Sequence, residues 1–317
     1  MRRAARLVVV LGAIAAALAY ATPAARGAAV GRDRVLAVLI ARGPQRYSRA
    51  SVETAFADAG AFLHRSSFGK LTLVPTLTPW LDGGSLRPDC SGSDRAFEPL
   101  RAIAAAAGYD PATFDSVFYV VDGVRCGFDG IEHDSDALLV TEPDARLIVH
   151  ELGHTFGLPH AAANGICTWF CMTYEQGDPF SPMGAGFTDF NAYEKEQLGW
   201  IPRQERVTRP GNYSVAPPMA IGSRRHALVL DMPDGEYWLE RRPGAGAPAL
   251  IVHVVHPELT ASWPIASATL LLGPIHRGHA AITRGQVFRV RGEFSVKVGR
   301  RLGTAIHVLV RLRATTR

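Results

Sequence analysis

The sequence predicts an α+β fold in its first part and an all-β, sandwich-like domain in its last part. Apolar strand patterns and helical patterns alternate up to about residue 160, as in a mixed sheet covered by helices. From Val207 onward, short β-rich runs are separated by glycine and proline. The charge balance changes as well, from 15 basic and 22 acidic residues in Thr22–Arg203 to 16 and 7 from Gln204 onward. We therefore expect one domain at 22–203 and a second at 204–317.

The first 21 residues have the pattern of a secretory signal peptide. Arg2, Arg3 and Arg6 precede the apolar stretch Leu7–Leu18, and Ala19-Tyr20-Ala21 offers a cleavage site between small residues. Export and release predict a secreted, extracellular protein with no membrane span once residues 1–21 are removed. An uncleaved N-terminal anchor is the alternative.

Strands and helices of the first domain follow from apolar periodicity and from capping residues. A helical pattern covers Ser48–Phe62, and a second helix runs from a cap at Asp94 toward Gly108. Asp144 stands at the N-cap position of a third helix. The predicted strands are Arg34–Ile40, Leu71–Val74, Ser116–Val121 and Asp136–Thr141.

The second domain contains β-rich runs only. They are Ala227–Leu230, Glu236–Glu240, Leu250–Val255, Gln286–Val290 and Thr304–Val310.

The third helix carries residues that predict a catalytic zinc site. In His150-Glu151-Leu152-Gly153-His154, the two histidines lie one helical turn apart on nearly the same face. Two neutral imidazoles at this spacing can bind one zinc ion, and Glu151 is placed to act as a general base beside it. Gly157 predicts a left-handed turn that ends the helix and brings His160 back as a third ligand. A buried amphipathic helix that merely happens to carry histidines would not need this glycine.

The four cysteines predict two disulfides in an exported protein. We favour pairing Cys90 with Cys126 and Cys167 with Cys171, because the second pair lies within one short loop. Three pairings are compatible with the sequence, and a cysteine-containing metal site is a further alternative.

Two charged regions give less specific indications of binding sites. Asp129, Glu132, Asp134 and Asp136 precede the third helix and offer oxygen ligands for calcium, or else form a solvated acidic loop. The basic second domain suggests an anionic cell-envelope polymer as a partner, or simply a soluble surface. No nucleic-acid-binding motif accompanies this charge, so nucleic acid is not an expected partner.

The run from His150 to His160 resembles the zinc signature of the metzincin peptidases. Tyr174–Gly184 resembles the segment that carries their turn methionine, here Met183, which would lie beneath the metal. The order of these features is similar to the gametolysin-type secreted metallopeptidases and, more distantly, to the immune-inhibitor-A type. The resemblance covers about residues 35–242 and implies one catalytic zinc ion and peptide substrates that lie extended along an edge strand. Ala185 stands where some metzincins have a tyrosine, so the oxyanion-stabilising group stays open, with Tyr174 and Tyr193 as alternatives.

We therefore expect a secreted zinc metalloendopeptidase that hydrolyses peptide bonds of protein or peptide substrates. His150, His154 and His160 would hold the metal, and Glu151 would accept the proton of the attacking water. The alternative is a secreted, zinc-stabilised binding or adhesion protein without proteolytic activity. Glu151 favours the enzyme, because a structural site has no need for a carboxylate beside the open metal position.

Overall fold

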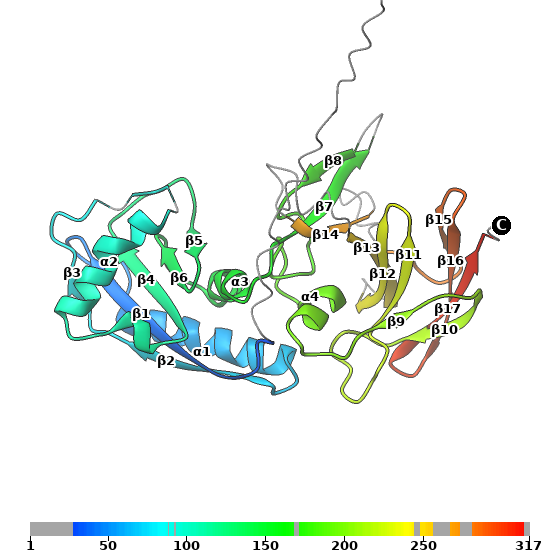
Figure 1. The fold of residues 1–317 in the computed structure, drawn as a ribbon, viewed down its shortest axis with the longest axis horizontal. Coiled ribbons are helices and arrows are strands. Elements are labelled where there is room, and N and C mark those ends of the chain that lie inside the picture. Colours follow the sequence, from blue (N-terminus) through cyan, green and yellow to red (C-terminus); the bar gives the residue numbers. More distant parts are fainter. Residues whose placement is uncertain are drawn as a thin grey trace, which may run out of the picture.

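The computed structural model confirms the α+β fold class. It describes residues 28–87, 89–91, 93–167, 171–243, 248–255, 267–272 and 281–313. Within these residues the chain forms four α-helices, a short 3₁₀ turn at Pro111–Thr113 and three β-sheets (Figure 1). The predicted signal peptide lies outside the described residues.

The first sheet has six strands and carries the N-terminal part of the fold. Its main order is β2-β1-β4-β6-β5, and the short β3 pairs with the end of β1. All pairings are parallel except that of β5 with β6, which makes β5 an antiparallel strand at one end of the sheet. The strands are β1 (Gly31–Ala41), β2 (Leu71–Leu77), β3 (Leu81–Asp82), β4 (Ser116–Asp122), β5 (Gly130–His133) and β6 (Asp136–Leu139).

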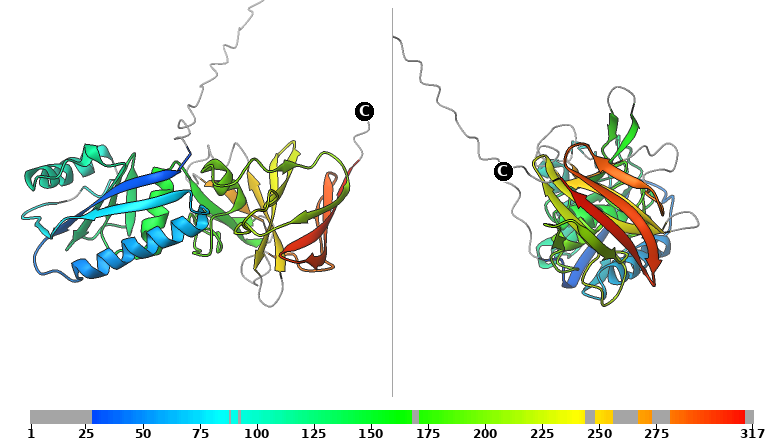
Figure 2. Two further views of the ribbon diagram at one scale, coloured as in Figure 1. Left: turned by 90° about the horizontal axis from the view of Figure 1, so that it is seen from below. Right: turned by 90° about the vertical axis from the view of Figure 1, so that its right-hand side faces the viewer.

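Helices cover both faces of this sheet (Figure 2). On one face, α1 (Arg49–Ser66) and α3 (Ala145–Thr155) bury their apolar sides in a shared core with β1 and β4. On the other face, α2 (Asp94–Ala106) packs against the alternate residues of the same strands. Asp94 is the first residue of α2 rather than its cap, a position that Ser93 occupies. Burial on both sides explains why these strands are continuous apolar runs.

A seven-stranded sheet joins the two parts of the chain. Its order is β8-β7-β14-β13-β12-β11-β9, and β7 pairs in parallel with β14, more than 100 residues later in the sequence. The sheet therefore includes strands from both sides of the boundary expected after Arg203, and the division into two domains stays a prediction. The strands are β7 (His160–Cys167), β8 (Cys171–Tyr174), β9 (Glu205–Arg206), β11 (Ala227–Met232), β12 (Gly235–Pro243), β13 (Pro248–Val255) and β14 (Ser267–Leu271).

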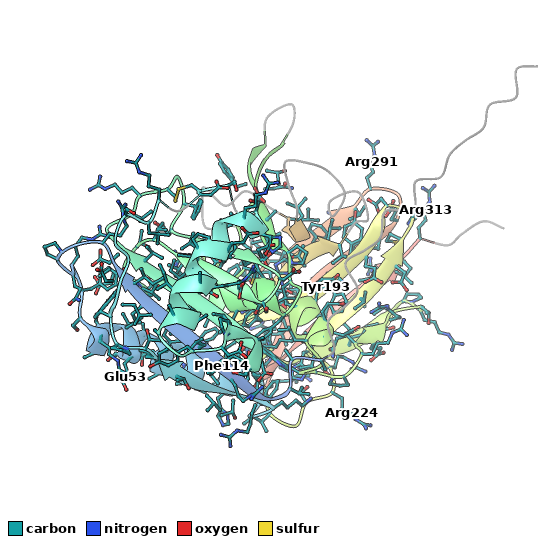
Figure 3. All side chains as sticks on the ribbon, turned by 60° about the vertical axis from the view of Figure 1, so that its left-hand side comes forward. Glu53, Phe114, Tyr193, Arg224, Arg291 and Arg313 are labelled. Carbon is teal, nitrogen blue, oxygen red and sulfur yellow. A yellow bond between two sulfur atoms is a disulfide. The ribbon has the colours of Figure 1, made fainter. Side chains whose placement is uncertain are left out.

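A four-stranded antiparallel sheet completes the sandwich-like C-terminal region. It has the order β10-β17-β16-β15 and packs its apolar face on β11, β12 and β13 (Figure 2, right). Basic side chains lie at its outer end, where Arg291 and Arg313 point away from the molecule (Figure 3). An anionic polymer as a partner of this surface stays a prediction. The strands are β10 (Gly211–Val215), β15 (Val287–Val290), β16 (Phe294–Leu302) and β17 (Ala305–Leu312).

Buried polar contacts fix the segment that precedes α4 (Ala192–Gln197) to the seven-stranded sheet. His253 of β13 lies 2.9 Å from the carboxylate of Asp178, and both side chains are almost fully buried. Burial opposes protonation of His253, but the Asp178 carboxylate outweighs it and raises the pKa of the imidazole. Arg242 of β12 donates to the backbone carbonyl of Asp189 at 3.1 Å. The strands after residue 203 therefore support the segment 178–189 that lies beneath the metal-ligand candidates.

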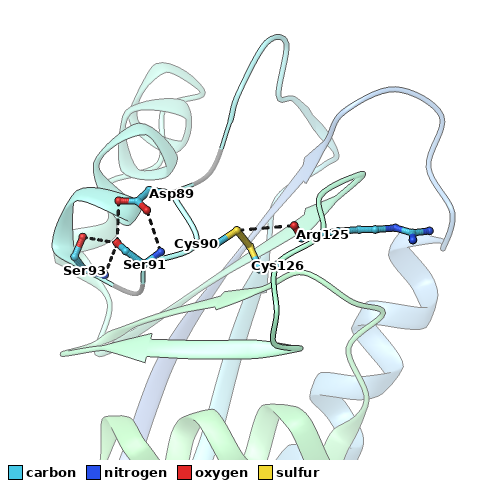
Figure 4. Close-up of a disulfide and its surroundings, with 6 residues drawn as sticks. All are labelled: Asp89, Cys90, Ser91, Ser93, Arg125 and Cys126. Carbon is cyan, nitrogen blue, oxygen red and sulfur yellow. Dashed lines mark hydrogen bonds between the residues drawn. A yellow bond between two sulfur atoms is a disulfide. The ribbon is translucent and has the colours of Figure 1, made fainter.

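The cysteines occupy two places in the fold. Cys90 and Cys126, which the sequence analysis paired, form a disulfide with their Cα atoms 5.6 Å apart (Figure 4). Cys167 and Cys171 are cross-strand partners in the backbone register of β7 and β8. Their side chains lie outside the described part, so this second disulfide stays a prediction.

No helix in the described ranges is both long and apolar enough to cross a bilayer.

Candidate metal centre

Helix α3 presents His150 and His154 from one end of the shared core. Asp144 is its N-cap, as predicted, and its carboxylate accepts a hydrogen bond from the amide of Leu147 at 2.7 Å. Ile148 and Leu152 are fully buried and hold the opposite side of the helix in the core. The histidine side of α3 therefore has a fixed position.

The end of α3 brings His160 to the other two histidines. Gly157 has a φ of 90°, the left-handed conformation that the sequence analysis assigned to it. The amide of Leu158 then donates to the carbonyl of Gly153 at 2.9 Å, which closes the turn. His160 follows as the first residue of β7.

The three imidazoles converge on one point. His150, His154 and His160 each offer a ring nitrogen, and these atoms lie within 4.8 Å of one another. The Nε2 atoms of His150 and His154 are 3.1 Å apart. Two nitrogens bound tetrahedrally to one zinc ion would be separated by about 3.3 Å, given Zn–N distances of about 2.0–2.1 Å. The separation of the His150 and His154 nitrogens therefore fits one zinc ion.

Hydrogen bonds to the remaining ring nitrogens fix the tautomers. Nδ1 of His150 donates to the carbonyl of Pro182, and Nδ1 of His154 donates to the carbonyl of Leu158, both at 2.8 Å. Because a carbonyl oxygen only accepts, each Nδ1 carries the proton and each Nε2 presents a lone pair. Two lone pairs that face each other at 3.1 Å repel unless a cation lies between them. This arrangement is typical of metal-binding histidines with oriented outer partners.

Burial favours the neutral form that a metal ligand needs. It lowers the pKa of His150 to about 4, and burial together with the neighbouring histidines lowers the pKa of His154 to about 3. Both rings are therefore neutral at pH 7.

Glu151 lies beside the histidines on the side of β5. Burial raises its pKa to about 8, and the nearby charge of Glu132 acts in the same direction. A divalent cation at the three histidines would favour the ionised carboxylate, which is the form that accepts a proton. A Cβ atom on Gly130 would lie 2.5 Å from Oε1 of Glu151, so the missing side chain of Gly130 leaves room for this carboxylate.

Met183 lies beneath α3, in a tight turn. It is fully buried, and its Sδ and Cε atoms occupy the space that a side chain on Gly153 would need. Gly153 stands between the two helical histidines in the sequence, so the methionine packs directly under the metal-ligand candidates. The preceding residue, Pro182, supplies the carbonyl that orients His150. The role of Met183 as a metzincin turn methionine stays a prediction.

Sequence reasoning gave no role to Glu175 and Gln176, which the structure places at His160. Oε1 of Glu175 lies 2.7 Å from Nδ1 of His160, and the amide of Gln176 lies 3.1 Å from its Nε2. Both residues belong to a turn that ends at Gly177, whose amide donates to the carbonyl of Tyr174 at 3.0 Å. The turn dipeptide Gln176-Gly177 was visible in the sequence, but its proximity to His160 depends on the pairing of β7 with β8.

Other candidates lie outside this cluster. Tyr193 packs edge-on against Trp238, where burial raises its pKa to about 12, and Tyr174 is exposed at the end of β8. Asp136 hydrogen-bonds to Arg101 at 2.7 Å. In the described part of the chain, the three histidines are the one group of three or more His, Cys, Asp or Glu ligands that converge. Calcium binding by the acidic residues stays a prediction.

The cluster opens into a cleft of about 800 Å³ between β5 and the turn at 174–177. Its walls include Gly130, Glu132, Glu151, Glu175 and Gln176. The geometry thus gives three converging imidazoles, a buried carboxylate beside them and an open space of substrate size.

Comparisons with known proteins give only remote similarities. No family model matches the chain, and no curated protein matches it. Among solved structures, metalloproteinase-II from Bacteroides fragilis is similar over 56% of each chain, with 14% identity and a TM-score of 0.34. A catalytically inactive OgpA from Akkermansia muciniphila, in complex with an O-glycopeptide, is similar over 69% of this chain and 72% of its own, with 10% identity and a TM-score of 0.33.

A chain in a chaperone–substrate complex is similar over 51% of this chain and 29% of its own, with 10% identity and a TM-score of 0.34. The present chain thus spans less than a third of that chain and little more than half of the Bacteroides metalloproteinase. At this level of similarity, function has to be inferred from the geometry of the site alone.

Proposed function

We propose that this protein is a secreted zinc endopeptidase of the metzincin type, similar to the gametolysin-type enzymes. The observation that carries the proposal is the pair of Nε2 lone pairs, on His150 and His154, that face each other at 3.1 Å with a buried carboxylate alongside. A structural metal site would explain the histidines. It would not explain Glu151, which is buried at the floor of an open cleft.

Each residue of the candidate metal centre has its own role in the proposed hydrolysis of a peptide bond. Zinc bound by the three imidazoles would supply Lewis-acid polarisation of the scissile carbonyl and acidify a water molecule. The carboxylate of Glu151 would take the proton of the attacking water and pass it to the leaving amine nitrogen. Pro182, Leu158 and Glu175 hold the ring orientations through Nδ1.

The substrate class and the location complete the proposal. The outer edge of β5 forms one side of the cleft, and an extended peptide can add to such an edge through backbone hydrogen bonds. The proposed secretion rests on the sequence pattern of residues 1–21.

Metal removal and replacement test the proposal. The mature protein should cleave unfolded casein, lose this activity after dialysis against a chelator and regain it with one equivalent of zinc. His154→Ala should bind zinc weakly and stay inactive after zinc is added. A wild-type protein that binds zinc and cleaves none of several unfolded proteins would favour the zinc-stabilised binding protein instead.

A further inference from the structure

The cleft beside the candidate metal centre is strongly acidic. Apart from the histidines, its charged lining side chains are five carboxylates and one guanidinium: Asp129, Glu132, Asp134, Glu151, Glu175 and Arg146. Side chains of like charge that line a concave, partly buried surface raise the local concentration of oppositely charged ligands. The charge of the walls therefore bears on which substrates enter.

The register of β5 determines which of its side chains face the cleft. Ile131 packs in the core on the side of α2, and the ring of His133 lies 6.1 Å from that of Phe97 in α2. Because side chains alternate along a strand, Gly130 and Glu132 face the opposite side, toward α3. A Cβ atom on Gly130 would point at the Glu151 carboxylate, which agrees with this direction.

Glu132 is therefore the first side chain on the cleft face of β5 after the bare Gly130. Two residues of a strand advance the chain by about 7 Å. Glu132 therefore lies about 7 Å along β5 from Gly130, the residue beside the Glu151 carboxylate. Asp134 follows Glu132 at the turn into β6 and also lines the cleft. The carboxylate of Asp134 lies 3.6 Å from Nδ1 of His133. Glu132 is therefore the carboxylate that the cleft face of β5 presents along the path of an extended peptide.

Glu175 supplies negative charge on the opposite wall. Its carboxylate contacts His160 from the turn at 174–177, and its side chain is 38% exposed. A peptide that lies between β5 and this turn has carboxylates on both sides.

The negative charge is local to the metal-centre part of the groove. An adjoining pocket of about 510 Å³ shares Gly127, Phe128 and Asp129 with the cleft, and its charged lining changes to Arg46 and Arg125. The side chain of Arg125 extends away from the disulfide in Figure 4. A uniform preference for positive charge along the whole substrate is therefore not expected.

We propose that the cleft selects peptides with lysine or arginine next to the scissile bond, and that the Glu132 carboxylate recognises the positive charge of this side chain. This inference rests on the proposed peptidase function and adds the substrate class to it. Glu132 acts on binding and specificity, whereas Glu151 acts on the proton of the attacking water.

Cleavage-site mapping and matched peptides test the inference. Digestion of a mixture of denatured proteins should give cleavage sites enriched in lysine or arginine within two residues of the cut bond. Quenched fluorescent peptides built on such a site, with lysine, glutamine or glutamate at the enriched position, should then differ in kcat/KM. We expect lysine to exceed glutamine by about tenfold and glutamate to be the poorest.

The variant Glu132→Gln should lose most of the lysine advantage: the ratio of kcat/KM for the lysine peptide to kcat/KM for the glutamine peptide, compared within this one variant, should fall to about twofold. Glu53→Gln is the matched control, because Glu53 is exposed on α1, away from the cleft (Figure 3). It should behave as the wild type. The lysine advantage should also shrink between low and high salt. Absence of enrichment, or an unchanged lysine preference in Glu132→Gln, would overturn the inference.

A binding measurement separates this inference from the proposed function. Glu151→Gln, which is expected to bind but not cleave, should bind a fluorescently labelled lysine peptide more tightly than the glutamine peptide in an anisotropy titration. The further change Glu132→Gln should remove the difference. If no variant cleaves any peptide but this difference in binding is found, the peptidase proposal fails and the charge selection stands. Equal binding of both peptides would refute the charge selection.

Discussion

The change Gly153→Ala tests whether Met183 lies beneath the histidine-bearing helix. A Cβ atom at this position would lie 3.0 Å from Cε of Met183 and would overlap its Sδ. In an unconstrained helix interior, glycine to alanine stabilises by about 1 kcal/mol. Here the methionine is fully buried, and overpacking of a core costs about 1–3 kcal/mol.

We therefore expect Gly153→Ala to lower the free energy of unfolding by about 1 kcal/mol, the reverse of the usual helix effect. Urea denaturation of the zinc-free protein measures this without a contribution from metal binding. Gly60→Ala in α1 is a matched control, because its nearest neighbour would be Cβ of Leu73 at an ordinary 3.6 Å. It should stabilise or leave stability unchanged.

The variant Met183→Ala provides the second half of a double-mutant cycle. Alone it should destabilise by about 2–5 kcal/mol through the cavity that it creates. Combined with Gly153→Ala it should cost less than the sum of the single changes, because the new methyl group occupies part of that cavity. Equal stabilisation by Gly153→Ala and Gly60→Ala, with additive behaviour of the double variant, would refute the packing of Met183 under the helix.

Three further outcomes follow from single contacts. Gly157→Ala should lose about 1–2 kcal/mol of stability in urea denaturation, because an L-residue is strained at a φ of 90°; an unchanged midpoint would contradict this. Glu175→Gln should weaken zinc binding by about 10- to 100-fold in competition with a chelator, since it removes the charge that orients His160; an equal affinity would exclude that role. Burial raises the pKa of the Asp33 carboxyl group from 3.8 to about 6. The folded protein therefore binds the carboxyl proton more tightly than the unfolded chain does. As a result, the free energy of unfolding falls as the pH rises from 3.8 to about 6. Asp33→Asn should therefore be more stable than the wild type above pH 6, by up to about 3 kcal/mol, and equally stable near pH 3, whereas a constant difference across this range would contradict the assignment.

Local signals in the sequence predicted the parts of the site that depend on local structure. Asp144 as a helix cap, the one-turn spacing of His150 and His154, and the left-handed turn at Gly157 each follow from a few neighbouring residues. The strands around 34–40 and 116–121 were recognisable because burial on both faces makes them continuous apolar runs.

The parts that sequence reasoning missed depend on contacts between distant segments. The parallel pairing of β7 with β14 joins residues that are over 100 positions apart, and no periodic pattern in the sequence predicts this pairing. The ion pair between Asp178 and His253 likewise depends on the finished sheet. Gly130 could be recognised as a turn or strand glycine, but only the fold shows that its missing side chain makes room for Glu151.

The most direct test of the central claim compares the wild-type protein with Glu151→Gln for zinc content and casein cleavage, side by side. The glutamine is nearly isosteric and leaves all three imidazoles in place, so both proteins should contain one zinc ion per chain. Cleavage should be found in the wild type and fall by at least about 100-fold in the variant, since a positioned general base contributes about 10²–10⁴-fold. Equal cleavage by both proteins, or a wild type without zinc, would contradict the assignment of a zinc peptidase in which Glu151 is the base.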